Sequence, residues 1–390
     1  MGEIFLKRGI LLFQRTVPHY RKKVFQALYE RLGVILCVGK KGPKNIYLSQ
    51  ELPSSLVERV RDFYPIHSIK NLVYMNIFSP LMKYRPGVII TEFSILILSN
   101  YLLLFLKPFF RYKLIIWSPV LNPRIGFSPE TSFRDRLRVW WMNQSDAVLT
   151  YSKNGRKQLI PYVDDPKKIF VAQNTLYTPA LLLFRDNLRK KGKNQVKREL
   201  GLSAQYNLMF IGRLIQEKKI LLLIEVFQKV ISWVPDIRLH IVGDGPEKRR
   251  LNKKIHELGL EDKATLYGSL TEPKASGKML FASDLTVIPG TVGLAVVHSF
   301  CFDTPVVTLK PGEKDPGHSP EIEYLVHGST GFEADSVESM VDMMVGYITN
   351  HKMQKYMGKE IERMVTRVCP FDRMIQGFED SIVYVKGKSD

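Results

Sequence analysis

A glycine and two cations close together in the middle of the chain, Gly212, Arg213 and Lys218, have the residue types that bind a diphosphate. A diphosphate needs close approach of the backbone, exposed N–H groups and positive charge, and a tight turn with cations near a helix N-terminus offers all three. Taken alone, these residues fit an ordinary loop with solvated charges equally well, because a Gly-Arg pair near a turn is a weak signal.

The elements that must position these residues are a strand, a loop, a helix and a second strand. Residues 208–211 are a short apolar run that ends at Gly212, and residues 221–234 carry apolar side chains at helical spacing. Residues 239–242 are a second apolar run, which the turn residues 243–246 close. This stretch therefore predicts one unit of an α/β fold, with the two cations between its first strand and its helix.

Similar alternation extends over most of the chain. We expect strands at 34–38, 88–91, 113–117, 147–151, 169–172, 208–211, 239–242, 264–267, 285–288 and 305–309. We expect helices between them, among others at 24–32, 95–106, 133–143, 221–234, 247–258, 274–282 and 294–302. Strands that alternate with helices predict an α/β protein with parallel, doubly wound sheets.

A chain of 390 residues is long for a single hydrophobic core, so we expect two Rossmann-like domains in tandem. The first comprises residues 1–180 and the second residues 201–368. Residues 181–200 are polar and strongly basic, and we interpret them as the connection between the domains. In the last segment, 369–390, the spacing of apolar residues predicts a helix over 371–385.

The positive charge is concentrated in the first half of the chain. Residues 1–180 contain 27 Lys and Arg against 11 Asp and Glu, whereas the whole chain has a net charge of +19. Such asymmetry favours contact with a polyanion, either nucleic acid or an anionic membrane surface. No nucleic-acid-binding module is recognisable, so we expect no nucleic-acid partner. A basic surface that serves only solubility is the alternative.

Other features place the protein in a reducing compartment and away from secretion. The three cysteines are far apart and lack metal-site or disulfide spacing. The first eight residues have no apolar core and no cleavage site of a secretory signal. Residues 93–110 are the most lipid-like run, but Asn100, Lys107 and Pro108 interrupt them, so we interpret the run as a buried helix rather than a membrane span.

Several motifs in order resemble the retaining glycosyltransferases of family 4. In the second half they are FIGRLIQEK at 210–218, IVGDGP at 241–246, LYG at 266–268, ASD at 282–284, residues 289–308, Glu321 and residues 328–332. In the first half they are PHYR at 18–21, DAVLTYS at 146–152 and IFVAQNT at 169–175. The resemblance implies the GT-B architecture, two facing Rossmann-like domains with a C-terminal helix that crosses back to the first.

The resemblance also implies roles for individual residues. Arg213 and Lys218 would hold the diphosphate of a nucleotide-sugar donor and act in catalysis. Further donor-binding positions would be Gly212, Tyr267, Gly268, Gly290, Thr291, Val292, Gly293, Leu294, His298 and Glu321. His19, Arg21 and Arg124 are candidates for the acceptor side. No metal ion or other cofactor is expected, because two cations and a helix terminus can stabilise the departing diphosphate and no Asp-x-Asp pair is present.

The sequence departs from the family pattern near the sugar. The family usually has two glutamates with seven residues between them around the glycine turn, and here Gly290 and His298 occupy those positions. A neutral imidazole still offers one donor and one acceptor to ribose hydroxyls. Residues 117–119 read Trp-Ser-Pro where many members place a histidine, and Lys219 stands where glycine is usual.

We expect an enzyme that transfers a sugar with retention from a UDP- or GDP-linked donor to a saccharide or polyprenyl-linked acceptor. Its place would be the cytoplasm, docked on the cytoplasmic face of an anionic membrane, in the biosynthesis of surface polysaccharide or glycoconjugates. Three alternatives remain open. They are a noncatalytic member that binds nucleotide sugar and partners an active transferase, a nucleotide-sugar epimerase of similar architecture, and a nucleic-acid-binding protein suggested only by charge.

Overall fold

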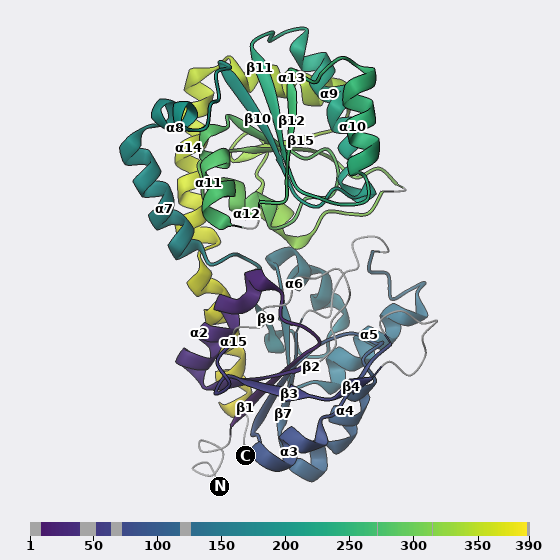
Figure 1. The fold of residues 1–390 in the computed structure, drawn as a ribbon. Coiled ribbons are helices and arrows are strands. Elements are labelled where there is room, and N and C mark those ends of the chain that lie inside the picture. The colour runs from purple at the N-terminus through teal and green to yellow at the C-terminus, as the bar shows by residue number, and fades with distance from the viewer. Residues whose placement is uncertain are drawn as a thin grey trace. The chain divides into compact units, whose positions relative to one another are not determined.

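The structure is a computed structural model that describes residues 9–39, 52–63, 72–117, 126–270, 272–313 and 315–387. The described residues form two compact units (Figure 1). The first contains the described residues up to 117 together with 126–173 and 372–387, and the second contains 174–270, 272–313 and 315–371. Both are parallel α/β units, so the expected fold class is confirmed.

The first unit is built on a parallel sheet. Its described strands are β1 (Ile10–Gln14), β2 (Val34–Gly39), β3 (Val57–Val60), β6 (Val88–Glu92), β7 (Lys113–Trp117), β8 (Ala147–Thr150) and β9 (Ile169–Val171). They are ordered β3-β2-β1-β6-β7-β8-β9. The chain runs outward in both directions from β1 and β6, so the sheet has its topological switch point between these two strands.

Helices cover both faces of this sheet. They are η1 (His19–Arg21), α2 (Lys22–Leu32), α3 (Phe78–Tyr84), α4 (Leu98–Phe110), α5 (Phe133–Gln144), α6 (Lys153–Leu159) and α15 (Phe371–Gly387). Trp117 of β7 contacts both Phe25 of α2 and Phe378 of α15, which places these helices on one face. Its neighbour Ile116 points to the opposite face and belongs to the core that Trp141 of α5 joins.

The C-terminal helix α15 belongs to the first unit, although the chain reaches it from the second. Gly377 lets the helix pack directly on β9, because a Cβ atom at this position would lie 2.3 Å from the carbonyl oxygen of Val171. Tyr384 adds a hydrogen bond of 2.8 Å to Asp165. The expectation that a C-terminal helix returns to the first domain is therefore confirmed.

The lipid-like run of the sequence is α4, and it is only partly buried. Leu103 is buried, whereas Phe105 and Phe109 are 66% and 70% exposed. The expectation of a buried helix was wrong for this face, because apolar residues occur all round the helix and the sheet covers only one side of it. Among the described helices, none is long and apolar enough to span a bilayer.

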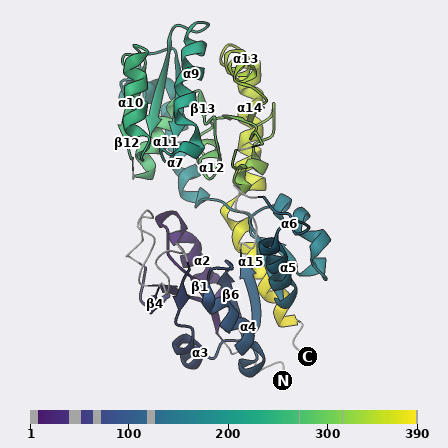
Figure 2. The ribbon, with the colours of Figure 1, turned by 90° about the vertical axis from the view of Figure 1, so that its right-hand side faces the viewer.

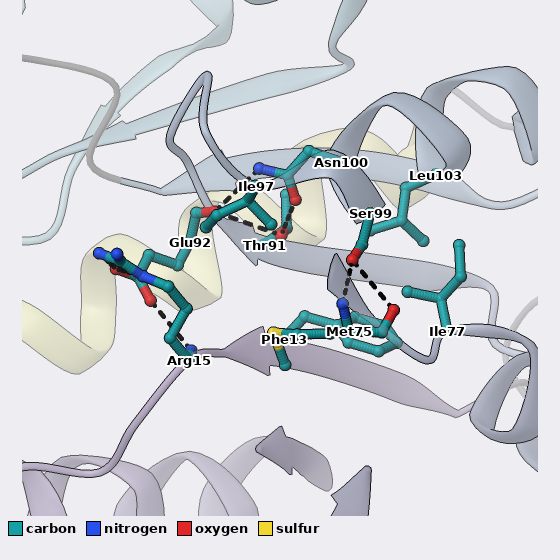
Figure 3. Close-up of a pocket in the computed structure, with 10 residues that line it drawn as sticks. All are labelled: Phe13, Arg15, Met75, Ile77, Thr91, Glu92, Ile97, Ser99, Asn100 and Leu103. Atoms are coloured by element: carbon teal, nitrogen blue, oxygen red, sulfur yellow. Dashed lines mark hydrogen bonds and ion pairs between the residues drawn. The ribbon is translucent and has the colours of Figure 1, made fainter. Parts of the chain in front are cut away.

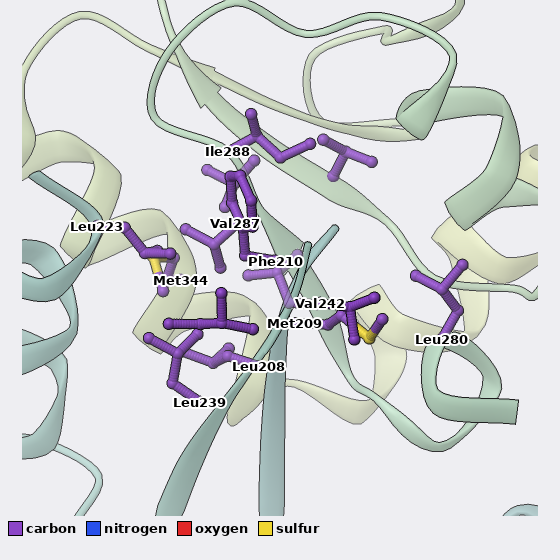
Figure 4. Packing of buried hydrophobic residues seen from close by; sticks show 14 of the residues in the cluster. Leu208, Met209, Phe210, Leu223, Leu239, Val242, Leu280, Val287, Ile288 and Met344 are labelled. Atoms are coloured by element: carbon purple, nitrogen blue, oxygen red, sulfur yellow. The ribbon is translucent and has the colours of Figure 1, made fainter. Parts of the chain in front are cut away.

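The second unit has a parallel sheet of the same kind. Its described strands are β10 (Tyr206–Ile211), β11 (Ile237–Val242), β12 (Ala264–Gly268), β13 (Leu285–Val287), β14 (Val306–Leu309) and β15 (Gly331–Ala334). Their order is β12-β11-β10-β13-β14-β15, so the switch point lies between β10 and β13. Leu208 and Phe210 of β10, Leu239 of β11 and Val287 of β13 pack in one buried cluster (Figure 4).

The helices of this unit complete its core. They are α7 (Thr178–Lys191), α8 (Lys193–Glu199), η4 (Gln216–Lys218), α9 (Ile220–Ile231), α10 (Lys248–Glu257), α11 (Pro273–Ala282), α12 (Ala295–Phe300), η5 (Pro320–Tyr324), α13 (Val337–Ile348), α14 (His351–Arg363) and the π-helix η6 (Met364–Val368). Helices α13 and α14 lie beside each other (Figure 2).

Residues 181–200, which we expected to connect the domains, instead lie in α7 and α8 of the second unit. Leu188 and Val196 are buried in its core, and Arg185 forms an ion pair of 2.6 Å with Glu362. The lysines and arginines that made this segment resemble a linker occupy mainly the outer face of amphipathic helices. The second unit therefore begins at residue 174.

Candidate active site

The glycine and the two cations found in the sequence lie at the switch point of the second sheet. Gly212, Arg213 and Lys218 follow β10, and residues 290–294 follow its neighbour β13. In open parallel sheets, ligands bind outside the carboxyl ends of the strands at such a point, where neighbouring loops diverge. The structure therefore brings together two loops that are more than 70 residues apart in the sequence.

Backbone hydrogen bonds join the two loops. The backbone N–H of Gly290 donates to the backbone carbonyl of Lys218 at 3.2 Å. The backbone N–H of Thr291 donates to the backbone carbonyl of Glu217 at 2.8 Å. A Cβ atom on residue 290 would lie 2.2 Å from the carbonyl oxygen of Glu217. Glycine is therefore required at 290 for this close approach, which gives a physical reason why no glutamate stands at that position.

The two cations differ in their surroundings. Arg213 is exposed, and its guanidinium makes no hydrogen bond or ion pair with the described residues, so it is available to a ligand. The Lys218 ammonium donates to the carbonyl of Thr291. Burial lowers the pKa of Lys218 to about 8, with Glu321 acting against the shift and Arg213 adding to it. The three groups thus lie within electrostatic reach of one another.

Glu321 of η5 is buried beside the glycine turn. It is 2% exposed and accepts a hydrogen bond from the side-chain amide of Asn174. The backbone carbonyl of Asn174 in turn accepts a hydrogen bond of 3.0 Å from the Tyr324 hydroxyl. A Cβ atom on Gly293 would lie 3.9 Å from Oε2 of Glu321. A buried carboxylate held by a neighbouring amide in this way keeps a fixed position next to the turn and the Lys218 ammonium.

This part of the chain also matches a known family. Residues 193–364 match the model of the family described as "Glycosyl transferases group 1". We call these residues the group 1 domain, after the family model that they match. The group 1 domain contains α8 and every strand of the second unit, together with both loops of the candidate site.

Comparison with curated proteins gives distant relatives. N-acetyl-alpha-D-glucosaminyl L-malate synthase of Bacillus anthracis is 22% identical over 196 residues, which cover 49% of this chain and 49% of that protein. The chain thus matches about half the length of this relative. The Campylobacter jejuni N-acetylgalactosamine-N,N'-diacetylbacillosaminyl-diphospho-undecaprenol 4-alpha-N-acetylgalactosaminyltransferase is 24% identical over 304 residues, which cover 76% of each chain.

Solved structures share the fold over the full length. A glycosyltransferase from Rickettsia africae has a TM-score of 0.71 at 15% identity and covers 98% of this chain and 100% of its own. Anabaena HepE, solved in complex with UDP and glucose, has a TM-score of 0.67 at 16% identity and covers 96% and 99%. These likenesses confirm a fold of two parallel-sheet, Rossmann-like domains.

Within the group 1 domain, the His318 side chain holds the glycine turn in place, a function that the sequence did not indicate. The N–H of Val292 donates to Nδ1 of His318 at 3.2 Å, and Nε2 of His318 lies 3.0 Å from the carbonyl oxygen of Leu309. Burial lowers the pKa of His318 to about 4, so the ring is neutral and donates from Nε2. Since its N–H is occupied, Val292 shapes the turn rather than presenting that N–H to a donor.

Two other expected donor-binding positions of the group 1 domain make contacts elsewhere. The hydroxyl of Tyr267 lies 3.1 Å from Nδ1 of His240, on the body of the sheet. The carbonyl of Gly268 accepts from the N–H of Gly243 at 2.8 Å and so closes the strand ends. The Tyr267 side chain is therefore not brought to Arg213 and Lys218 by any described contact.

The short helix α12 of the group 1 domain follows the glycine turn directly. Leu294 is its N-cap residue, and His298 lies on it with its ring 5.6 Å from that of Phe302. Burial lowers the pKa of His298 to about 4, so its imidazole is neutral at pH 7 and offers one donor and one acceptor. Because α12 is shorter than two turns, the two cations must supply most of the positive charge.

Lys219 of the group 1 domain adopts a backbone conformation that suits glycine. Its φ is 50°, in the left-handed region that residues with a Cβ adopt at a cost of about 1–2 kcal/mol. Its ammonium lies 2.5 Å from Oδ2 of Asp315, an ion pair that holds the lysine there. The geometry explains why glycine is usual at this point of the loop.

Of the three acceptor-side candidates, only Arg21 has a side chain that the structure describes. The Arg21 guanidinium is buried 5.0 Å from the ring centres of both Trp117 and Tyr151, which indicates a packing function. The side chain of His19 and the whole of Arg124 lie outside the described residues. None of the three is therefore supported as an acceptor contact by its described surroundings.

Sequence reasoning missed a polar group at the switch point of the first sheet. Arg15, after β1, forms an ion pair of 2.6 Å with Glu92 at the end of β6 (Figure 3). Gln14 donates to the same carboxylate at 2.9 Å. Thr91 and Asn100 hydrogen-bond next to them at 2.8 Å. The signal in the sequence was that two apolar strand runs are each followed by a charged residue, Arg15 and Glu92.

We expect donor binding to fall as pH rises through 8, because Lys218 then loses the charge that attracts the diphosphate. The dissociation constant of UDP, titrated calorimetrically between pH 7 and 9, should therefore increase above pH 8. Lys218→Arg is the control, since a guanidinium stays charged throughout this range and should flatten the profile. An unchanged slope in Lys218→Arg would assign the titration to another group.

Proposed function

We propose that the protein is a glycosyltransferase that moves a sugar from a UDP- or GDP-linked donor to a saccharide or polyprenyl-linked acceptor. The observation that carries the proposal is the pairing of Arg213 and Lys218 with a glycine turn at the switch point of a group 1 glycosyltransferase domain. An exposed arginine without an ion-pair partner among the described residues, beside a partly buried lysine that is mostly charged at pH 7, is suited to a multiply charged anion.

The same groups fit the chemistry of the transfer. As the bond between the sugar C1 and the phosphate oxygen breaks, negative charge accumulates on the departing diphosphate. Arg213 and Lys218 are positioned before the reaction, so they stabilise this charge more strongly in the transition state than in the ground state. In this proposal the reaction requires no metal ion, because the two cations stabilise the leaving group.

Retention at the anomeric carbon is part of the proposal and rests on the family resemblance. In a front-face route the acceptor hydroxyl attacks the face from which the diphosphate leaves. The departing phosphate oxygen then accepts the acceptor proton, so no protein nucleophile is needed. Glu321 lies next to the glycine turn and Lys218, and we assign it to positioning the turn and the donor sugar.

The comparisons support the donor and acceptor classes. HepE, which shares the fold, was solved with UDP and glucose, which supports a uridine-linked donor. The Campylobacter relative is named for a diphospho-undecaprenol acceptor, which supports a lipid-linked acceptor here. Biosynthesis of surface polysaccharide or glycoconjugates is the process that these classes suggest.

A noncatalytic, nucleotide-sugar-binding protein is the second candidate, because Gly290 and His298 replace the two glutamates of the resembled family. Both hypotheses predict nucleotide binding, and only the first predicts turnover. A panel of UDP- and GDP-sugars should therefore be tested for thermal stabilisation and for release of free nucleotide diphosphate. Stabilisation without release, with candidate lipid-linked and saccharide acceptors present, would favour the noncatalytic protein.

We further propose that the first unit docks on the cytoplasmic face of an anionic membrane. Exposed aromatic side chains occur on α4 and α5: Phe105 and Phe109 on the former, Phe133 and Trp140 on the latter. The two helices are neighbours, because the ring of Tyr101 lies 5.2 Å from that of Trp141. Exposed basic residues in the same unit would add about 1 kcal/mol each near an anionic surface.

The expected result is binding to anionic but not neutral liposomes in a co-sedimentation assay. Raising salt from about 0.1 to 1 M shortens the screening length from about 10 to 3 Å and should release the protein. Phe105→Ser with Phe109→Ser should weaken binding, whereas Trp233→Ser, an equally exposed aromatic residue of the second unit, should not. Absence of binding at low salt would exclude membrane docking and leave the transferase proposal untouched.

A further inference from the structure

A second basic site lies in the first unit, whereas Arg213 and Lys218 belong to the second. It is a cleft of about 360 Å³ between α6, β9 and α15. The charged and amide side chains that define it are Lys153, Arg156 and Lys157 of α6, Gln173 after β9, and Arg373 and Asp380 of α15. Among these residues, only Gln173 belongs to a motif of the resembled family, IFVAQNT at 169–175.

The cations of this cleft have little protein counter-charge. No ion pair joins Lys153, Arg156, Lys157 or Arg373 to any acidic side chain in the part of the chain that the structure describes. Asp380 accepts a hydrogen bond of 2.8 Å from Gln376 of its own helix. Four cations and one carboxylate give the cleft a net positive charge. The cations repel one another, and an anion bound between them would reduce this repulsion.

Gln173 distinguishes the cleft from an ordinary basic surface. Its side chain is 4% exposed, and its Nε2 has no hydrogen-bond partner among the described residues. A buried donor left without an acceptor costs about 1–3 kcal/mol, so such groups usually have a partner that the protein alone does not supply. Gln173 is one of the residues that line the cleft, so we infer that a hydrogen-bond acceptor bound there is the partner of its amide.

The backbone around the cleft is closely packed. Gly377 of α15 faces β9 so closely that a Cβ atom would lie 2.3 Å from the carbonyl oxygen of Val171. On the other side, Nε of Arg156 donates to the carbonyl of Ile169 at 3.0 Å, which leaves its terminal nitrogens for a ligand. Both contacts fix the distance between the elements that carry the cations.

We propose that this cleft binds a phosphate-bearing anion with more than one negative charge. Guanidinium groups bind phosphate oxygens in pairs, ammonium groups add point charges, and the Gln173 amide donates from the buried side. A single carboxylate would leave most of this positive charge unmatched. The phosphate belongs either to a soluble compound or to the headgroup of a membrane lipid, and the site does not depend on the proposed transferase activity.

Inorganic pyrophosphate is the probe for the test, with Arg213→Ala and Lys218→Ala combined to disable the proposed nucleotide site. In this background, pyrophosphate should still bind in a calorimetric titration. Arg156→Gln with Arg373→Gln should weaken that binding by about tenfold or more for each lost guanidinium. The control is Arg249→Gln with Arg367→Gln, which removes two exposed arginines of the second unit and should leave binding unchanged.

Gln173→Leu separates a specific site from general charge, because it leaves every cation in place. We expect it to weaken pyrophosphate binding while the melting temperature stays constant or rises, since a buried unpartnered donor is removed. A second arm uses vesicles of phosphatidylglycerol. If the protein sediments with these vesicles, and if both pyrophosphate and the paired substitutions at Arg156 and Arg373 prevent this, the phosphate belongs to a lipid headgroup. If the paired substitutions weaken pyrophosphate binding and the protein does not bind the vesicles, the phosphate belongs to a soluble compound.

The proposal is overturned if the disabled background binds no pyrophosphate, or if the control pair weakens binding as much as the cleft pair. It is also overturned if Gln173→Leu keeps full affinity while the cleft pair loses it, since nonspecific attraction by charge then suffices. These outcomes concern only the first unit. Failure of the transferase proposal would instead appear as absent turnover with unchanged pyrophosphate binding at the cleft.

Discussion

Arg213→Ala and Lys218→Met, made separately, are each expected to lower turnover with a nucleotide-sugar donor by about 10²–10³-fold. Removal of one positioned transition-state donor typically has this effect, which corresponds to about 2.7–4 kcal/mol. Arg213 has no described protein partner to lose, so its removal should leave the fold intact. The measurement is kcat and KM for donor consumption at pH 7, where Lys218 is mostly charged.

The control for this pair is Lys253→Ala, which removes an exposed lysine of α10 in the same unit and should change neither constant. A decrease confined to KM would mean that the residue binds donor and transition state equally well. Wild-type kcat and KM in either variant would refute the function that we assign to that residue.

Gly243→Ala should have the largest effect on stability near the site. Its Cβ atom would lie 1.8 Å from the carbonyl oxygen of Gly212, so the loop that begins with Gly212 and Arg213 must move. Overpacking of this kind typically costs about 1–3 kcal/mol, and the displaced loop should also bind UDP more weakly. Urea-induced unfolding and calorimetric titration with UDP measure the two effects.

Gly358→Ala is the matched control, because Gly358 lies within α14 and nothing lies within 4 Å of the added Cβ. Alanine in a helix interior should raise the free energy of unfolding by about 0.5–1 kcal/mol and leave UDP binding unchanged. If Gly243→Ala were as stable as the wild type and bound UDP normally, the close contact between the two loops would not matter for the site.

The fold could be predicted from the sequence where apolar runs were short, continuous and regularly spaced, as at β10, β11 and β7. Such runs identify strands buried on both faces of a parallel sheet. Residues 181–200 could not be assigned in this way, because their density of lysine and arginine masks the apolar positions at Leu188 and Val196. Short elements such as α3 and α6 were also missed, since seven residues carry too little periodicity.

The site could be predicted in part, because Gly212, Arg213, Lys218 and Gly290 belong to contiguous motifs. The positions of Glu321 and His318 relative to those motifs depend on tertiary contacts with Asn174 and Leu309, which no local pattern encodes. Tyr267 illustrates the converse error. It lies in a recognised motif, yet its side chain points to His240. A motif fixes the backbone of a loop better than it fixes the direction of each side chain.

The most direct measurement is a crystal structure of the protein saturated with UDP. The account predicts that the diphosphate lies at the carboxyl ends of β10 and β13, with phosphate oxygens within hydrogen-bond distance of the Arg213 guanidinium and the Lys218 ammonium. It also predicts that the Val292 N–H remains bound to His318. Diphosphate bound at other residues, with Arg213 and Lys218 left in solvent, would contradict the central claim.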